Sequence, residues 1–409
     1  MVSKTLRAAR AFLTENARWL AAGFLLAFGS SFGQTFFIAI FAEPIRTDFS
    51  LSYGEWGAIY MVGTLASAAL LVWAGPLVDS VSPRWLTLAA TLSLAGVCVL
   101  TALAWSVWML PLLVFGLRFF GQGVMSHLSQ TLTAKRFAAT RGRALATASL
   151  GYPAGEALIP LTAVAAIAAL GWRPAWLLAA AMLFFAFTPA FWVLLRRERT
   201  PPTAMQGVSE GVGPTSGGWT RREALRSRAF WVLAPGFVAP SYILTIVFFF
   251  PAHIAASKGW PLADWAASYA IYAVVSVLAG LATGWAIDRF SARALVPVYQ
   301  LPLALGVLTL STGESTEAMM SAMVLFGISA GATATLHTAI WAELFGNRHL
   351  GAIKSVAHAI MVLGSAVGPG VAGALLDLGV PFADQCLAMA TYVALVSALW
   401  ATRRRDLKF

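Results

Sequence analysis

Long runs of hydrophobic residues alternate with short charged segments from one end of this chain to the other. A run of about 18 or more apolar residues with few charges is long enough to cross a bilayer as a helix. The runs predict twelve transmembrane helices, near residues 19–42, 55–78, 85–105, 108–134, 144–170, 174–195, 229–256, 264–287, 294–312, 317–343, 351–377 and 383–402. The chain is therefore expected to be an all-α membrane protein. No cleavage site of small residues interrupts the first run, so we expect a retained helix and not a signal peptide.

The pattern breaks once, between residues 196 and 228. Gly, Pro, Ser and Thr replace the apolar residues there, and arginines stand at both ends of the segment. Such a composition is typical of a linker. We therefore expect a six-helix bundle at 1–195, a linker at 196–228 and a second six-helix bundle at 229–409.

The positions of the basic residues predict the orientation in the membrane. The sequence has 28 Lys and Arg and a net charge of +11 at pH 7, although only 11% of its residues are charged. Arg46, Arg173 and Lys258 lie in one set of loops and Arg118 lies inside a span, whereas all the others lie at the termini, in the linker or next to the opposite loops. Basic residues concentrate on the cytoplasmic side of membrane proteins. We expect a bacterial inner-membrane protein with both termini and the linker in the cytoplasm, and no nucleic-acid partner.

One stretch of ten residues occurs twice. Residues 75–84 read Gly-Pro-Leu-Val-Asp-Ser-Val-Ser-Pro-Arg, and residues 284–293 read Gly-Trp-Ala-Ile-Asp-Arg-Phe-Ser-Ala-Arg. The shared Gly, Asp, Ser and Arg lie 209 positions apart, and the same offset relates Tyr60 to Tyr269. A constant offset over so long a span predicts two copies of one structural unit.

The repeated stretch resembles the loop between helices 2 and 3, and its echo between helices 8 and 9, in the major facilitator superfamily. The usual pattern is Gly-x-Leu-Ala-Asp-Arg-x-Gly-Arg-Arg. The first copy departs from it at Ser80, Ser82 and Pro83, while the second keeps Asp288 and Arg289. The resemblance covers the whole chain. It implies the major facilitator fold, with twelve transmembrane helices in two pseudo-symmetric six-helix bundles, and secondary transport by alternating access at a site near the midplane.

Within that superfamily the segments look most like the monocarboxylate transporter and oxalate–formate antiporter branch. The similarity lies in residues 51–56, 75–77, 141–142, 151–160 and 171–173. Members of the branch typically hold the substrate carboxylate with a basic residue in helix 8, but the comparable stretch here, 276–280, has no charge. The resemblance implies a small, monocarboxylate-like organic anion as substrate.

Arg118 is the charged residue that stands out within the spans. It lies ten residues into its span, about 15 Å below the outer end, where an arginine costs at least about 2.5 kcal/mol to insert. On an α-helical wheel four polar residues share its face, which should turn toward the bundle interior. They are Gln122, Ser126, Ser129 and Thr133. We expect Arg118 and Gln122 to bind the substrate.

Glu156, in the next span, is the expected partner of Arg118 and the expected proton carrier. An unpaired carboxylate at membrane depth would take up a proton. An anion that displaced Glu156 from Arg118 would therefore couple the movement of the anion to that of a proton. A purely structural Arg–Glu pair is the alternative.

Further polar residues complete the expected site. For substrate binding they are Gln34, Tyr152, Tyr269, Tyr272, Ser276 and His358. Gln34 could instead serve helix packing, and His337, the second candidate for proton coupling, could instead hydrogen-bond a neighbouring helix, as could His358. Conformational gating is expected of Asp79, Arg84, Asp288, Arg289 and Arg293 at the repeated loops.

Three local features concern packing. Gly33, Gly151 and Gly155 are expected to allow close helix approach. Ser52 is expected to cap the second span, with Glu55 as its capping-box partner. The prolines of the seventh span should release backbone groups that need other partners.

Several functions are excluded by what the sequence lacks. It contains no nucleotide-binding Gly-rich loop, no His-Glu-x-x-His pair and no nucleophile elbow. We therefore expect no enzyme, no cofactor and no metal, but a monomeric, proton-coupled secondary transporter of a small organic anion, as in a symporter. The alternatives are a proton-coupled exporter of amphipathic or cationic compounds, with Glu156 as its proton carrier, and a non-transporting membrane sensor or scaffold.

Overall fold

The computed structural model describes residues 2–137, 140–196, 218–346 and 348–402. All the regular elements within these ranges are helices, which confirms the expected all-α class. Most of the predicted linker, residues 197–217, lies outside the described residues. The division into bundles at 1–195 and 229–409 stays a prediction.

Eleven helical segments of the described chain are long and apolar enough to cross a membrane. Each overlaps one predicted span. They are Phe12–Ile40, Tyr53–Ala74, Pro83–Ala102, Val107–Arg136, Arg141–Leu170, Trp172–Leu194, Arg228–Phe249, Leu262–Phe290, Thr316–Phe345, Leu350–Asp377 and Phe382–Thr402. The ninth predicted span, 294–312, is interrupted near its start, and its apolar helix α18 covers Leu301–Thr312.

The helices group into two compact units. The first unit contains the chain up to Ile38, residues Ala66–Ile159, and the described residues from Ala165 to the linker. Its elements are α1 (Val2–Gly29), η1 (Ser30–Gly33), α5 (Leu77–Ser80), α6 (Pro83–Ala102), η2 (Val107–Met109), α7 (Leu110–Gly116), η3 (Leu117–Met125), α8 (Ser126–Arg136), α9 (Arg141–Ser149), α11 (Trp172–Met182), η5 (Leu183–Phe187) and α12 (Thr188–Leu194).

The second unit contains Ala39–Leu65, Pro160–Val164 and the described residues after the linker. Its elements are α3 (Ala42–Phe49), α13 (Arg221–Arg226), α14 (Arg228–Phe249), α15 (Pro251–Lys258), α16 (Leu262–Phe290), α17 (Ala292–Leu295), α18, α19 (Thr316–Phe345), α20 (Leu350–Asp377) and α21 (Phe382–Thr402). Three helices have residues in both units, namely α2 (Thr35–Ile40), α4 (Tyr53–Ala74) and α10 (Gly151–Leu170).

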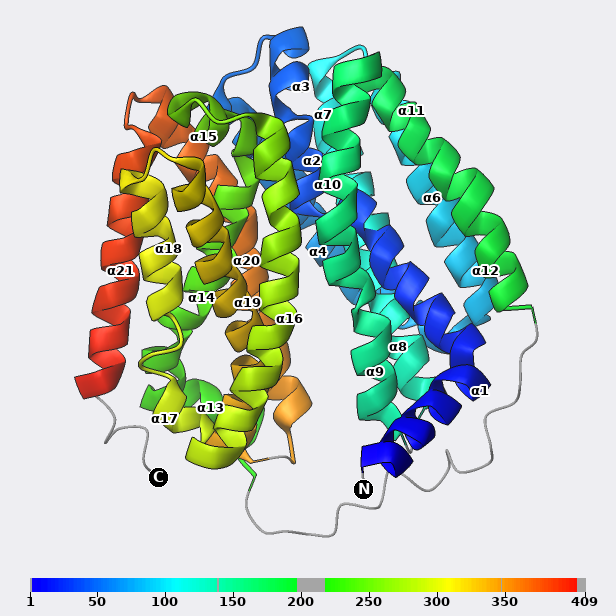
Figure 1. Cartoon of the computed structure of the whole chain (residues 1–409), viewed down its shortest axis with the longest axis vertical. Helices are drawn as coiled ribbons and strands as arrows, with labels where there is room; N and C mark the ends of the chain where they lie inside the picture. Colours follow the sequence, from blue (N-terminus) through cyan, green and yellow to red (C-terminus); the bar gives the residue numbers. More distant parts are fainter. Residues whose placement is uncertain (1, 138–139, 197–217, 347, 403–409) are drawn as a thin grey trace. The chain divides into compact units, whose positions relative to one another are not determined.

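The same helix pairings recur in the two units, as the sequence repeat predicts. In the first unit α1 packs on α9, and α6 packs on α11. In the second unit α14 packs on α20, and α18 packs on α21; α18 and α21 lie side by side in Figure 1. The members of these pairs correspond at the 209-residue offset seen in the sequence. The repeat therefore describes the packing as well as the signature loop.

The first span is broken in its middle. Helix α1 ends at Gly29, the 3-10 turn η1 follows, and Gln34 is extended before α2 begins. A Cβ atom added to Gly33 would overlap the carbonyl oxygen of Leu117, and one added to Gly121 would lie 2.6 Å from the Gly33 Cα. Only glycine fits such backbone contact, so the expected close packing at Gly33 is confirmed.

The ninth span is broken by a turn that also repairs α14. Pro240 has no N–H group to donate to Gly236, one helical turn earlier in α14. The side-chain amide of Gln300, in the turn between α17 and α18, donates to the Gly236 carbonyl oxygen instead. The same amide donates to the Tyr299 hydroxyl at 2.6 Å, and that hydroxyl lies 3.2 Å from Nε2 of His337. The sequence predicts that the prolines of the seventh span leave backbone groups in need of partners. At Gly236 that partner is Gln300, in the turn that interrupts the ninth span.

A methyl group at Gly33 should destabilise the protein. We expect Gly33→Ala to lower the free energy of unfolding by about 1–3 kcal/mol, the usual effect of overpacking. Thermal unfolding of the detergent-purified variant measures this. Gly96→Ala, in α6, is the matched control, because nothing lies within 4 Å of its added Cβ atom. Equal melting temperatures for Gly33→Ala and the parent would contradict the contact between η1 and η3.

Loss of the Tyr299 hydroxyl should also destabilise the protein. Tyr299→Phe removes an acceptor from Gln300 and the partner of His337, both buried, at a cost of about 1–3 kcal/mol. Tyr392→Phe is the matched control, since its hydroxyl donates to Pro235 from an exposed position. A control that is as destabilised as Tyr299→Phe would show that the buried network adds nothing.

Candidate functional site

Arg118 lies in the π-helical segment η3 and is only 3% exposed. Its Nη1 donates to the carbonyl oxygen of Gly33 and to Oγ1 of Thr35, each at 3.3 Å. Both acceptors belong to the break in the first span. π-Helical turns within α-helices are frequent at functional sites. The guanidinium is therefore held where two irregular backbone segments meet.

The expected pair between Arg118 and Glu156 is wrong for this structure. Within the described residues no ion pair joins the two side chains, and Arg118 donates to Gly33 and Thr35 instead. Glu156 is half-buried in α10, next to Gly155, where a Cβ atom would overlap Oγ of Ser31. The reason is the break itself, which offers neutral oxygens to the guanidinium. For the Glu156 carboxylate no hydrogen bond or ion pair is found in the described part of the chain.

The polar stripe beside Arg118 is divided by the π-helix. The α-helical wheel assumes about 100° per residue, which does not hold through the nine residues of η3. Ser129 donates to the Gly23 carbonyl oxygen at 2.7 Å, and Thr133 faces the same glycine of α1. Ser126 and Thr133 therefore need not share the surroundings of Arg118, and Ser129 serves helix packing. Gln122 lies within η3 and is half-buried.

Two further expected residues lie in the first unit. Gln34 is half-buried at the end of η1, between Gly33 and Thr35. Tyr152, one turn before Glu156 in α10, donates to the Ser126 carbonyl oxygen at 3.3 Å and accepts from Gln130 at 3.4 Å. Of the expected residues in the first unit, Gln34 and Arg118 lie together at the break in the first span. Gln122 lies next to them, because it follows Gly121, whose backbone contacts Gly33.

The expected residues of the second unit occupy different environments. Tyr269 and Tyr272 are buried and pack on Phe248, with ring centroids 5.0 Å away in each case. Ser276 is half-buried and donates to Ala273 within its own helix at 2.9 Å. His358 is exposed, whereas His337 is buried against Tyr299. For His337 this geometry favours hydrogen bonding over proton relay.

The first signature loop is held by basic side chains. The Arg84 guanidinium lies 3.4 Å above the Trp192 ring. Lys135 donates to the Val78 carbonyl oxygen at 3.4 Å, and His127 Nε2 lies 3.2 Å from the Gly75 carbonyl oxygen. The side chain of Asp79, an expected gating residue, lies outside the described residues.

In the second signature loop the first residue of α17 is bound by Glu343 of α19. Glu343 pairs with Arg293 at 3.1 Å and accepts from the backbone N–H of Ala292 at 2.8 Å. Asp288 and Arg289 are exposed, and no hydrogen bond or ion pair of theirs is found among the described residues. Sequence reasoning missed Glu343, although an acid at the end of an apolar span beside a basic loop was a usable signal.

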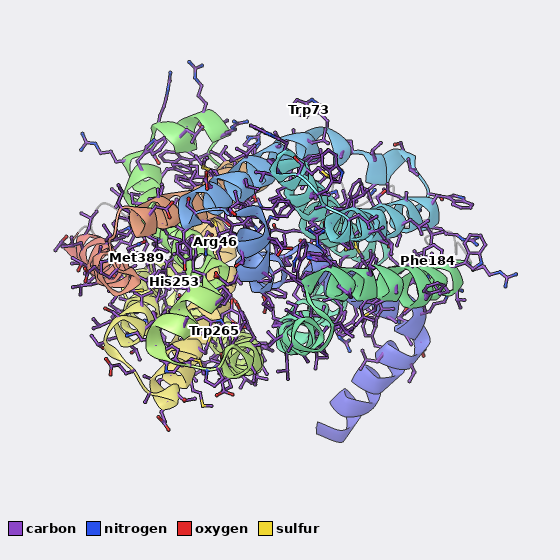
Figure 2. All side chains as sticks on the ribbon, turned by 90° about the horizontal axis from the view of Figure 1, so that it is seen from above. Arg46, Trp73, Phe184, His253, Trp265 and Met389 are labelled. Carbon is purple, nitrogen blue, oxygen red and sulfur yellow. The ribbon has the colours of Figure 1, made fainter. Side chains whose placement is uncertain are left out.

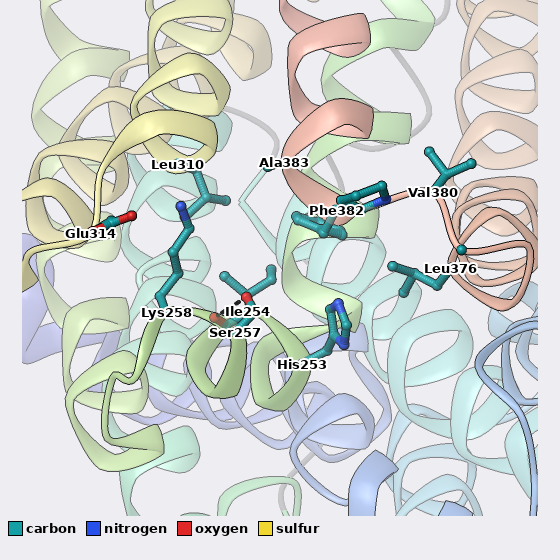
Figure 3. Close-up of a pocket in the computed structure, with 12 residues that line it drawn as sticks. His253, Ile254, Ser257, Lys258, Leu310, Glu314, Leu376, Val380, Phe382 and Ala383 are labelled. Atoms are coloured by element: carbon teal, nitrogen blue, oxygen red, sulfur yellow. Dashed lines mark hydrogen bonds between the residues drawn. The ribbon is translucent and has the colours of Figure 1, made fainter.

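A cavity of about 600 Å³ lies in the second unit, between α15 and the turns that precede α19 and α21 (Figure 3). Its charged residues include Lys258 and Glu314, with His253 and Phe382 on another wall. Lys258 already donates to the Ser311 carbonyl oxygen at 2.9 Å, and Glu314 accepts from Trp260 through its backbone oxygen at 2.6 Å. These polar contacts brace the turns.

Comparison with known proteins agrees with this architecture. The profile of the Major Facilitator Superfamily matches residues 23–280 and again residues 245–408. None of the curated proteins matches the chain in sequence.

Solved transporter structures share the fold. A bacterial homolog of the human lysosomal transporter Spinster, in its inward-facing and unoccupied conformation, superposes with a TM-score of 0.74 at 16% identity over 96% of this chain and 97% of that one. Its occupied conformation gives 0.71 at 16% identity over 95% and 96%. The nucleoside transporter NupG gives 0.70 at 11% identity over 95% and 99%. The chain is a multi-pass membrane transporter, not an enzyme, and it belongs to the major facilitator superfamily.

Proposed function

We propose that this transporter moves a small, monocarboxylate-like organic anion by alternating access, coupled to protons, as a monomer in a bacterial inner membrane with both termini in the cytoplasm. The observation that supports the anion is Arg118, a permanently charged group that is buried within a spanning segment. Arginine stays protonated even when buried. A positive charge at that depth favours a negatively charged ligand.

The hydrogen bonds from Arg118 to the break in the first span are long and go to neutral atoms. Those to the oxygens of Gly33 and Thr35 are each 3.3 Å long. A guanidinium binds a carboxylate through shorter, charge-assisted bonds and can present two parallel N–H groups to it. A substrate carboxylate that reaches Arg118 would therefore compete with these neutral acceptors.

Such competition would connect binding to movement. The oxygens that Arg118 holds belong to the junction between η1 and α2, so an anion that takes over the guanidinium loosens the tie between this junction and η3. Gln34 and Gln122 lie at the same junction and serve as further ligands. Tyr152, Tyr269, Tyr272, Ser276 and His358 remain proposed substrate contacts, to be reached in other states of the cycle.

Glu156 is the proposed proton carrier. Its carboxylate is half-buried in a spanning helix, where the neutral form avoids the cost of a buried charge. We therefore assign it the uptake and release of a proton as its surroundings change during the cycle. His337, bonded to Tyr299, is the weaker candidate for this role. The proposed gating residues are Asp79, Arg84, Asp288, Arg289 and Arg293, to which we add Glu343.

A second candidate function is export of amphipathic or cationic compounds in exchange for protons. Glu156 favours it, because an ionised carboxylate within a span attracts a cation as readily as it carries a proton. In that case Arg118 serves only the helix break.

The decisive variants are Arg118→Lys and Glu156→Gln. A lysine keeps the charge but loses the planar fork, so we expect Arg118→Lys to weaken binding of short monocarboxylates about 10-fold or more. Glu156→Gln should keep the binding and lose the pH dependence of uptake. Ligand-induced thermal stabilisation of the purified protein and uptake into proteoliposomes measure the two effects.

Arg173→Lys is the matched control, since Arg173 donates to the carbonyl oxygens of Ala102 and Ala104 at 3.0 and 2.6 Å. It should leave carboxylate binding unchanged. If amines stabilise the parent protein and carboxylates do not, the anion proposal fails and export of cations takes its place.

A further inference from the structure

The start of α4 is tied by side chains at each of its first backbone N–H groups. The N–H of Glu55 donates to Oγ of Ser52 at 3.1 Å, and Oε2 of Glu55 accepts from the N–H of Ser52 at 2.8 Å. This is the capping box that the sequence predicts. It satisfies one of the N–H groups that a helix start leaves free. It involves only Glu55 of α4 and Ser52, the residue before α4.

The two N–H groups between Ser52 and Glu55 are bound by another helix. The N–H of Tyr53 donates to Oδ1 of Asp377 at 3.0 Å, and the N–H of Gly54 donates to Oδ2 at 2.7 Å. Asp377 is the last residue of α20 and lies 324 positions from Tyr53 in the sequence. A carboxylate is well placed at a helix start, where free N–H groups and the helix dipole both favour negative charge.

Beside these bonds the two helix backbones touch. A Cβ atom added to Gly57 would overlap the Pro369 carbonyl oxygen, and one added to Gly373 would overlap that of Tyr53. A Cβ atom on Gly54 would lie 2.6 Å from Oδ2 of Asp377. At these glycines the two backbones approach each other with no side chain between them.

The Tyr53 side chain is clamped from two sides. The guanidinium of Arg46 lies 3.5 Å above its ring, and Nδ1 of His253 lies 3.0 Å from its hydroxyl oxygen. Arg46 and His253 appear close together in the view from above (Figure 2). Arg46 also pairs with Glu43 at 2.9 Å. The beginning of α4 is thus bound by charged and polar groups of α3, α15 and α20, all in the second unit.

The end of α4 belongs to the first unit. The residues of this helix up to Leu65 group with the second unit, and those from Ala66 group with the first. Alternating access moves parts of a transporter relative to one another, and a shared helix would carry such a movement to the contacts at its start. The carboxylate of Asp377 is exposed, so water can replace the two N–H groups when the contact opens.

We propose that Asp377 is a positioning residue of the transport cycle, which fastens the start of α4 to the end of α20 in one state and releases it in another. We call the bonds from Tyr53 and Gly54 to Asp377 the α4–α20 latch. The proposal rests on alternating access as the proposed mechanism, but on no assumption about the substrate. In this proposal Asp377 sets the balance between the states and takes no part in substrate binding.

The latch can be tested by the distance between α4 and α20. Spin labels at Ala58→Cys and Leu378→Cys, both exposed positions, report this distance by pulsed electron paramagnetic resonance in nanodiscs without ligand. The native cysteines, Cys98 and Cys386, are buried. Asp377→Asn removes the charge and leaves one acceptor. We expect the ratio of separated to contacting molecules to rise about 5-fold, the effect of losing a capping carboxylate.

Asp384→Asn is the matched control, because it removes the same charge from an exposed position nearby and should leave the distances unchanged. Gly54→Ala is the second variant, since its methyl group would displace the Asp377 carboxylate; it should act like Asp377→Asn, and it decides the matter if Asp377→Asn does not fold. Unchanged distances in a folded Asp377→Asn or Gly54→Ala protein, or an equal shift in Asp384→Asn, would overturn the proposal. Because no ligand is present, that result would leave the anion proposal untouched.

Discussion

A carbonyl oxygen that is released inside a membrane span must find a donor within the protein, because lipid offers none. This requirement explains the polar contacts at the two interrupted spans described above. The break in the first span exposes Gly33, and Arg118 donates to it. Pro240 deprives Gly236 of its donor, and Gln300 supplies one.

The same requirement connects structure to transport. A side chain that donates to a broken helix also holds the broken segment in one conformation. If the donor is removed, the carbonyl oxygen is left exposed to lipid or to a water-filled cavity. A group with a permanent charge can bind a carboxylate better than a neutral oxygen. Arg118 donates to the break in the first span, and in our proposal it is also the group that binds the substrate anion. Its position lets a ligand compete directly with a structural bond.

Sequence patterns predicted what depends on local periodicity. Eleven of the spans, the Ser52–Glu55 capping box and the close approach at Gly33 each follow from residue types at short, regular spacing. The π-helix η3 and the ninth-span break were not predicted, because both depend on contacts with other helices, such as that between Gln300 and Gly236. The Arg118–Glu156 pair was expected from the charges and membrane depth of two residues on consecutive spans, whereas in the structure Arg118 donates to Gly33 and Thr35 of the broken first span. Asp377 was missed because a bond from a side chain to a distant backbone N–H leaves no sequence pattern.

The most direct test of the central claim compares each short monocarboxylate with its own primary amide on the unmodified protein. The two ligands have nearly the same shape and differ in charge, so the comparison isolates the contribution of a buried cation. Isothermal titration calorimetry of the purified transporter should show carboxylate binding at least about 10-fold tighter than amide binding, as expected for a hydrogen bond between charged groups. Equal affinities within each pair, or tighter binding of the amide, would contradict the role assigned to Arg118.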